Sequence, residues 1–171
     1  MNVPNPIATR LLAAAGTLLL TTSASWASPG DTPARDINTL RQATSAFFSF
    51  EVGTSAGWDT PLSGCVESPD GGMGYHYANL DLLMDDGELS LLHPEVLLYA
   101  PTEDGSMAFV GVEYIIPGPD WPHAEPPHFL GHDLHYNPVQ DIWALHAWVG
   151  EHNPSGVLAD FNPRVSCQFA E

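Results

Sequence analysis

The stretch EVLLYAPTEDGSMAFVGVEYII, residues 95–116, decides the predicted fold. It contains two apolar runs, Glu95 to Tyr99 and Met107 to Ile116, and a polar segment at residues 102–106 lies between them. Short apolar runs on both sides of a Gly-containing polar segment are typical of a β-hairpin. We therefore predict two antiparallel strands joined by a loop at residues 102–106.

Short apolar segments continue on both sides of this hairpin. From residue 71 onward they alternate with Gly, Pro and Asp, which is typical of an antiparallel sheet. We predict one further strand from Gly74 to Asn79, and a loop at residues 117–127, where five Pro residues exclude a helix interior or a central strand. Near the C-terminus, Asn-Pro turns separate two segments that we expect to be extended, Val157 to Ala159 and Arg164 to Phe169.

The segment from Pro138 to Val149 fits two structures. Asn137 followed by Pro138 is a suitable start for a helix, and a helical face would then carry Ile142, His146 and Val149. As a strand, the same segment would place bulky side chains on both faces, which suits a strand that is buried on both sides. We predict a strand from about Ile142, because its aromatic and β-branched residues favour one.

Residues 34–52 precede the sheet and have the pattern of an amphipathic helix. The larger apolar side chains recur near helical spacing, at Ile37, Leu40, Phe47, Phe48 and Val52. Gly53 and Gly57 are expected to end this helix. The sequence thus predicts an α+β protein in which an N-terminal helix is followed by a mainly antiparallel sheet or a small open barrel.

The first 27 residues have the pattern of a signal peptide. Arg10 precedes an apolar run from Leu11 to Leu20, and Ser25 and Ala27 occupy the positions that signal peptidases read. We predict cleavage after Ala27 and one secreted or periplasmic domain at residues 28–171; the alternative is a retained N-terminal anchor. No later apolar stretch approaches the length of about 18 to 20 residues that a membrane-spanning helix needs.

The charge balance narrows the range of partners. The sequence has 4 Lys and Arg residues against 21 Asp and Glu residues, and its formal net charge is −17. Nucleic acids and anionic membranes need a basic surface, so neither is an expected partner. Such acidity suits a solvated secreted protein, a cation-rich setting or a cationic ligand.

The chain contains two cysteines, Cys65 and Cys167, and both follow the predicted signal peptide. An exported chain reaches an oxidising compartment, so we predict that they form one disulfide. Closing a loop of about 100 residues stabilises a fold by roughly 4 to 5 kcal/mol in the chain-entropy description. The alternative is two free thiols or metal ligands, although neither cysteine has a nearby Cys or His at the spacing of a zinc site.

The chain also carries a set of short motifs: GGMGYHY at residues 71–77, PEVLLY at 94–99, VGVEY at 110–114, LHAW at 145–148, NPSG at 153–156 and NPRVSC at 162–167. Together they resemble a family of small, secreted bacterial proteins of uncharacterised function, and the resemblance spans most of residues 28–171. It implies no activity. It does imply that His76, Glu113 and His146 lie in characteristic motifs of that family.

If the predicted strands form, His76, Glu113 and His146 each lie on a strand face among small or apolar neighbours. Two imidazoles and a carboxylate are a ligand set for Zn, Cu, Mn or Fe, and His132 or His135 could complete it. We therefore predict a metal site from these five residues, similar in composition to a three-His, one-Glu centre. The alternative is that the three strand residues form a hydrogen-bonded polar core and that His132 and His135 lie on the surface.

Two other patterns carry no prediction. Residues 53–57 read G-x-S-x-G, but the nucleophile elbow that this motif describes needs a strand before it and a helix after it. The acidic segment 85–88 lacks the alternating acidic positions of a calcium loop. No catalytic residue is assigned.

Three hypotheses for the function follow. The first is a secreted or periplasmic protein whose His/Glu pocket binds a divalent metal or a small polar ligand. The second is a structural or interaction protein of the cell envelope, with a histidine-containing core that has no ligand. The third is a metal-assisted hydrolase or an oxygen-using enzyme, with Glu113 as a ligand or base.

Overall fold

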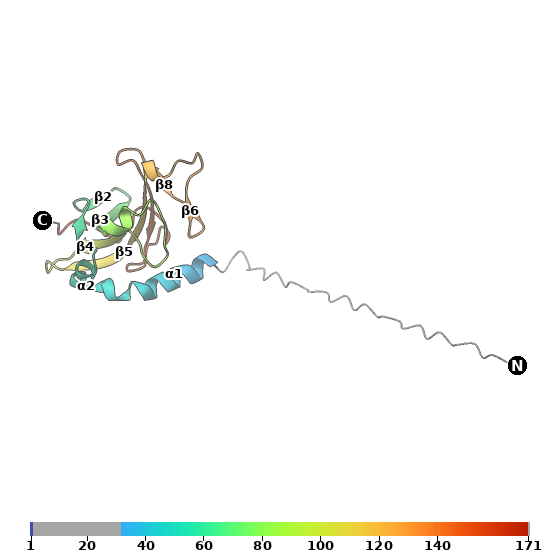
Figure 1. Cartoon of the computed structure of the whole chain (residues 1–171). Helices are drawn as coiled ribbons and strands as arrows, with labels where there is room; N and C mark the ends of the chain where they lie inside the picture. Colours follow the sequence, from blue (N-terminus) through green and yellow to red (C-terminus); the bar gives the residue numbers. More distant parts are fainter. Residues whose placement is uncertain (2–31, 171) are drawn as a thin grey trace.

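The computed structural model describes residue 1 and residues 32–170 of the chain (Figure 1). The predicted signal peptide, its cleavage site and the alternative N-terminal anchor lie outside the described residues. None of the helices in the described part has the length and apolar character that crossing a bilayer requires.

The helical region before the sheet consists of three segments: α1 (Thr32–Ala43), the 3-10 helix η1 (Ser45–Phe48) and α2 (Phe50–Ser55). The prediction of one continuous helix from Ala34 to Val52 was therefore wrong. Ser49 has extended backbone angles, and its hydroxyl accepts a hydrogen bond from the Val52 N–H at 3.3 Å, so it ends one segment and caps the next. Gly53 lies inside α2 rather than at its end. A Cβ at this position would meet the Tyr99 hydroxyl at 2.5 Å, so the packing of α2 against Tyr99 leaves no room for a side chain.

The strands that follow are β1 (Thr60–Pro61), β2 (Val66–Ser68), β3 (Gly71–Ala78), β4 (Val96–Pro101), β5 (Met107–Pro117), β8 (His135–Asn137) and β9 (Ile142–Ala147). They form one sheet in the order β1-β3-β4-β5-β9-β8, with β2 paired to β3, and every pair is antiparallel. The strands β6 (His128–Phe129) and β7 (His132–Asp133) form a separate hairpin. Short helices α3 (Leu80–Leu83) and η2 (Gly118–Asp120) follow β3 and β5.

This architecture confirms the predicted α+β class with a mainly antiparallel sheet, and the sheet is open rather than closed into a barrel. The predicted hairpin is β4 and β5, with Thr102 to Ser106 as its loop. The strand predicted from Ile142 is β9, so the helical alternative is excluded. It lies between β5 and β8, where a helix would leave both neighbours without backbone partners.

The C-terminal tail differs from its prediction. Residues 157–159 and 164–169 form turns and irregular backbone, and the described tail contributes only an isolated bridge between Asn162 and Gly72. The carboxamide oxygens of Asn153 and Asn162 accept hydrogen bonds from the backbone two residues further on, at 2.9 and 3.0 Å. These local turns fold the tail onto itself and prevent extended pairing.

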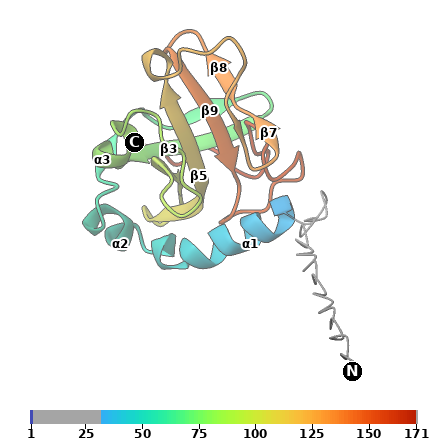
Figure 2. The same cartoon turned by 45° about the vertical axis from the view of Figure 1, so that its right-hand side comes forward.

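The sheet has two apolar faces. The larger core lies between one face and the helices α1, η1 and α2, and it includes Leu40, Leu97, Tyr99, Val112 and Tyr114; Figure 2 shows α1 passing beneath β5 and β9 as drawn. A smaller cluster lies on the opposite face, formed by Ala78, Val96, Leu98, Val110, Ile115, Trp148 and Val165. Because side chains alternate along a strand, Glu113 between Val112 and Tyr114 points to the face with the smaller cluster.

The predicted disulfide between Cys65 and Cys167 is confirmed, with a Cα–Cα distance of 5.7 Å. It joins the loop before β2 to the tail, and the Cys167 N–H donates to a carboxylate oxygen of Glu67 at 2.8 Å. The disulfide thus fixes the tail over the sheet face that carries the smaller cluster.

Candidate metal centre

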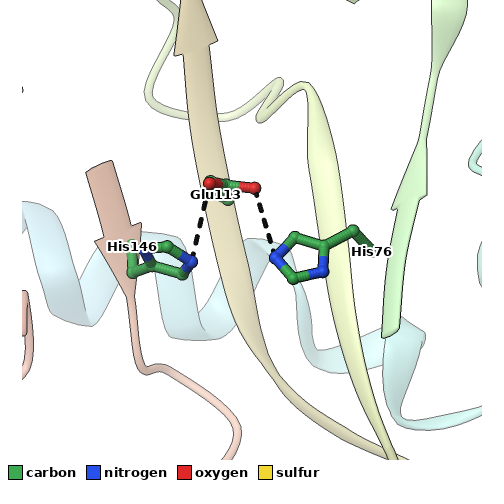
Figure 3. Close-up of side chains that lie close together, drawn as sticks. All are labelled: His76, Glu113 and His146. Carbon is green, nitrogen blue, oxygen red and sulfur yellow. Dashed lines mark ion pairs between the residues drawn. The ribbon is translucent and has the colours of Figure 1, made fainter. Parts of the chain in front are cut away.

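Three strands place His76, Glu113 and His146 on one face of the sheet. Glu113 of β5 and His146 of β9 are direct partners in the antiparallel register. His76 lies on β3, two strands away from β5, and its ring extends across β4 toward Glu113. Figure 3 shows the carboxylate of Glu113 between the two imidazoles.

The three side chains meet at short distances and away from solvent. Nε2 of His146 lies 3.5 Å from Oε1 of Glu113, and Nε2 of His76 lies 3.6 Å from Oε2. One ligand atom from each residue lies within 4.8 Å of the other two. His76, Glu113 and His146 are only 8%, 5% and 3% exposed.

The contacts between Glu113 and the two imidazoles are longer than hydrogen bonds. A hydrogen bond between an imidazole and a carboxylate has a donor–acceptor distance of about 2.7 to 3.2 Å, which is shorter than both separations. Among the described residues, neither ring nitrogen of His146 has a hydrogen-bond partner. Buried polar groups are almost always paired, so this imidazole lies where a further ligand would be expected.

The outer nitrogen of each imidazole faces a second polar group. Nδ1 of His76 lies 3.1 Å from the Ser63 hydroxyl, and Nδ1 of His146 lies 4.0 Å from Oδ1 of Asp160. Histidines that bind a metal through one nitrogen commonly direct the other to a carboxylate, hydroxyl or carbonyl group. The outer nitrogen of His76 is thus within hydrogen-bond distance of Ser63 and leaves Nε2 free to bind a metal beside Glu113. At 4.0 Å, Nδ1 of His146 lies near Asp160 without a hydrogen bond to it.

Burial shifts the proton equilibria of all three groups. It lowers the pKa of His76 to about 4 and that of His146 to about 3, because a buried imidazolium loses its hydration. Burial also raises the pKa of Glu113 to about 8, with further contributions from Asp160 and Glu95. In the metal-free protein Glu113 is therefore mostly protonated at neutral pH, and it releases this proton when a metal binds. At neutral pH both imidazoles are therefore unprotonated and have a lone pair on one nitrogen, which is the form that binds metals.

A cavity of about 450 Å³ opens beside this group, and all three side chains line it. Its other walls come from the loop that carries Ser63, from the turn between β8 and β9, and from Asp160 and Phe161 of the tail. Trp148 stacks against the His146 ring on the inner side, with ring centroids 6.1 Å apart and planes 11° from parallel. The three-residue group is thus closed on one side by the protein and open to a cavity on the other.

The five residues that the sequence indicated do not all come together. His132 lies in the β6–β7 hairpin and is exposed. His135 is exposed at the edge of the cavity, where its Nδ1 lies 3.0 Å from both carboxylate oxygens of Asp160. In the described part of the chain, the cluster of possible ligands on this face consists of His76, Glu113 and His146.

Sequence reasoning did not identify Ser63, Asp160 or Glu95. Ser63 and Asp160 come from irregular segments, which have no periodicity to indicate their direction. Glu95 lies just before β4, where its carboxylate accepts a hydrogen bond from the Ile115 N–H at 3.0 Å. It is 1% exposed and adds a second buried carboxylate near Glu113.

Comparison of the chain with protein-family models, with curated proteins and with solved structures finds no match. The resemblance to a family of small secreted bacterial proteins therefore stays a prediction. What the site binds is inferred from its distances, burial and residue types.

Proposed function

We propose that this chain binds one divalent transition-metal ion through Nε2 of His76, Nε2 of His146 and the carboxylate of Glu113. The observation that supports this most directly is the buried, unpaired imidazole of His146, 3.5 Å from the Glu113 carboxylate. Burying an imidazole without any hydrogen bond destabilises a protein, and binding a cation there offsets that penalty.

The separations between the groups suit such an ion. Around a tetrahedral zinc ion with bonds of about 2.0 to 2.1 Å, neighbouring ligand atoms lie about 3.3 Å apart. The nitrogen–oxygen separations of 3.5 and 3.6 Å, each to a different oxygen of Glu113, exceed this by a few tenths of an ångström. One ligand atom from each of the three residues lies within 4.8 Å of the others, so the side chains must rotate inward to bind one ion. Two imidazoles and one carboxylate suit Zn, Fe, Mn or Cu.

A second function, catalysis at the metal, is favoured by the cavity. Three protein ligands leave at least one coordination position free, which is the arrangement of catalytic rather than structural sites. A divalent ion held in this way lowers the pKa of a bound water toward neutrality. In this extension of the proposal, the chain is a metal-assisted hydrolase or an oxygen-using enzyme, with Glu113 as a ligand or base and the Asp160 carboxylate near His146.

The proposed location is the periplasm or the extracellular space. The disulfide between Cys65 and Cys167 supports this, because such bonds persist in oxidising compartments. The competing hypothesis, an envelope protein whose histidine core has no ligand, leaves the unpaired ring of His146 without an explanation.

Metal analysis of the purified, oxidised protein tests the proposal. We expect about one metal ion per chain after incubation with Zn²⁺ and removal of excess metal, as a single three-ligand site requires. His76→Ala and His146→Ala should lose this metal while circular dichroism shows the fold intact. His132→Ala is the matched control, since it removes an exposed imidazole outside the group. Binding that survives both site substitutions contradicts the proposal.

A further inference from the structure

The cavity beside the three candidate ligands has the size of a site for a small organic molecule. Its volume is about 450 Å³, and such sites in proteins generally have volumes of about 300 to 1,000 Å³. The cavity is therefore large enough for more than a metal ion and its water ligands.

Most of the cavity wall is apolar. The apolar part of the wall consists of side chains from the β1 edge, from β2 and β3, from the middle strands and from the tail. These side chains are Leu62, Val66, Met73, Ile115, Ile142 and Phe161. Polar groups on the β8–β9 turn lie at its edge, including the Tyr136 hydroxyl, which donates to Asp141 at 2.6 Å. A molecule in this cavity would contact apolar side chains along its length and polar groups at its two ends.

The ionisable groups that line the cavity are two carboxyl groups, three imidazoles and the phenol of Tyr136. Glu113 and Asp160 are the carboxylates, and no Lys or Arg side chain is among the lining residues of the described chain. The sequence has no Lys, and Arg164 is paired with Glu151 at 3.4 Å. Proteins bind phosphates and carboxylates mainly through Arg and Lys, so the part of a ligand that lies away from the metal finds no partner here for a negative charge.

The net charge of the chain acts in the same direction. At −17 it repels anions and attracts cations near the surface, over distances of about 10 Å at moderate salt. A bound divalent ion attracts an anionic head group locally, but Glu113 and Asp160 offset much of its charge.

We infer that this cavity binds an uncharged or cationic organic molecule, whose polar head group reaches the metal and whose apolar body lies against the wall from Leu62 to Phe161. The inference rests on the proposed metal centre and adds the class of ligand. It excludes ligands that have a phosphate or carboxylate group on the end distant from the metal.

Three hydroxamic acids that share one metal-binding head test this assignment. Benzohydroxamic acid is uncharged, its 4-aminomethyl derivative is cationic, and its 4-carboxy derivative is anionic. We expect the first two to bind the Zn²⁺-loaded protein about tenfold or more tightly than the third, by calorimetry at low ionic strength, which corresponds to about 1.4 kcal/mol. Equal affinities for all three compounds overturn the assignment.

A pair of variants tests whether charges at the cavity, rather than the net charge of the chain, cause the preference among the three compounds. Gln140 lies at the edge of the cavity, whereas Gln42 lies on α1, which packs against the opposite face of the sheet. Gln140→Lys and Gln42→Lys therefore add the same charge at two different places. We expect Gln140→Lys to remove or reverse the preference against the carboxylate and Gln42→Lys to retain it. The same response in both variants overturns the assignment, since the discrimination then arises from net charge alone.

Metal content, measured in the same samples, separates the two proposals. A protein that holds its metal but does not discriminate among the three compounds contradicts the ligand class and leaves the metal centre intact. A protein that holds no metal contradicts the metal centre, and the ligand class with it.

Discussion

The imidazole of His146 lies between two carboxylates, with Glu113 facing its Nε2 and Asp160 facing its Nδ1. The two contacts differ in burial, since Glu113 is 5% exposed whereas the Asp160 side chain is 41% exposed. In the proposed centre, Glu113 binds the metal directly and Asp160, 4.0 Å from Nδ1, acts from outside through its negative charge. Single substitutions can test these two roles separately.

Asp160→Asn should weaken metal binding without abolishing it. The substitution removes the negative charge that faces Nδ1 of His146, and losses of about 10- to 100-fold in metal affinity are typical for such outer groups. Competition titrations with a chelator measure the change. Asp133→Asn is the matched control, because Asp133 also pairs with an imidazole, that of His128 at 2.7 Å, but in the exposed β6–β7 hairpin. Equal effects of both substitutions contradict the role of Asp160.

Glu95 makes stability depend on pH in a defined direction. Burial raises the pKa of Glu95 to about 8 in the folded chain, from an ordinary value of 4.5. Between these values the folded state holds a proton that the unfolded state releases, so the free energy of unfolding falls as the pH rises from about 4.5 to about 8. The loss from this group amounts to a few kcal/mol at most.

Glu95→Gln should flatten that dependence, because Gln does not titrate and its amide oxygen can still accept from the Ile115 N–H. Urea unfolding of the metal-free protein between about pH 5 and pH 8 measures the slope. Glu103→Gln in the exposed β4–β5 loop is the matched control, because it makes the same substitution at the surface. An identical slope in wild type and Glu95→Gln contradicts the assignment.

At the scale of the elements, the pairing of β5 with β9 positions two of the three candidate ligands. Gly111 of β5 lies where a Cβ would meet the Ala147 carbonyl oxygen at 2.7 Å, so the two strands approach closely just beside the Glu113–His146 pair. A side chain at this position would displace one strand from the other.

Gly111→Ala should therefore reduce both stability and metal affinity. Forcing a methyl group into a packed interior costs about 1 to 3 kcal/mol, and the shift of β9 changes the separation of Glu113 and His146. Chemical unfolding and metal titration measure the two effects. Gly64→Ala should leave both unchanged, because its added Cβ would have no atom within 4 Å.

The alternation of side chains along strands made the sheet predictable, whereas the helical region was predicted only in part. Residues 95–116 show two apolar runs around a polar loop, and this local pattern contains all the information that a hairpin needs. The break near Ser49 depends on one hydroxyl that caps α2, and apolar spacing does not reveal it. The prediction of an extended tail relied on its apolar residues. The turns that form there instead depend on side-chain hydrogen bonds of Asn153 and Asn162, which the apolar pattern does not show.

At the scale of the whole molecule, the disulfide holds the tail that completes the cavity. Cys167 follows Asp160 and Phe161, which line the cavity, and its bond to Cys65 closes a separation of 102 residues. The three buried ligands come from the sheet, so they depend on this bond less directly than the cavity wall does.

Replacing both cysteines by Ser should lower the free energy of unfolding by about 2 to 5 kcal/mol. Below the unfolding transition, we expect the variant to keep its metal but to bind benzohydroxamic acid more weakly, because Asp160 and Phe161 are no longer held in place. Thermal unfolding, metal analysis and calorimetry on one preparation provide the three values. Loss of the metal, or retained metal with an unchanged affinity for benzohydroxamic acid, contradicts this separation.

The site was predictable only where periodicity determined side-chain direction. His76, Glu113 and His146 lie on strands, so alternation indicated that each could point to a buried face. The order of the strands, which brings β3 and β9 to opposite sides of Glu113, is a property of the tertiary fold. His132 and His135 lie close in sequence to the predicted site, but their short strands direct them to the surface.

Trp148 gives the molecule an optical probe of its own centre. Its indole stacks on His146, and its backbone N–H and ring N–H donate to the carbonyl oxygens of Val157 and Ala159, next to Asp160. A bound paramagnetic ion such as Cu²⁺ would quench the emission of this indole, whereas Zn²⁺ would not. Movement of the tail would instead expose the ring to water and shift its emission to longer wavelength. Because the chain contains five Trp residues, the difference between the spectra of wild type and Trp148→Phe isolates this emission and distinguishes an occupied centre from a displaced tail.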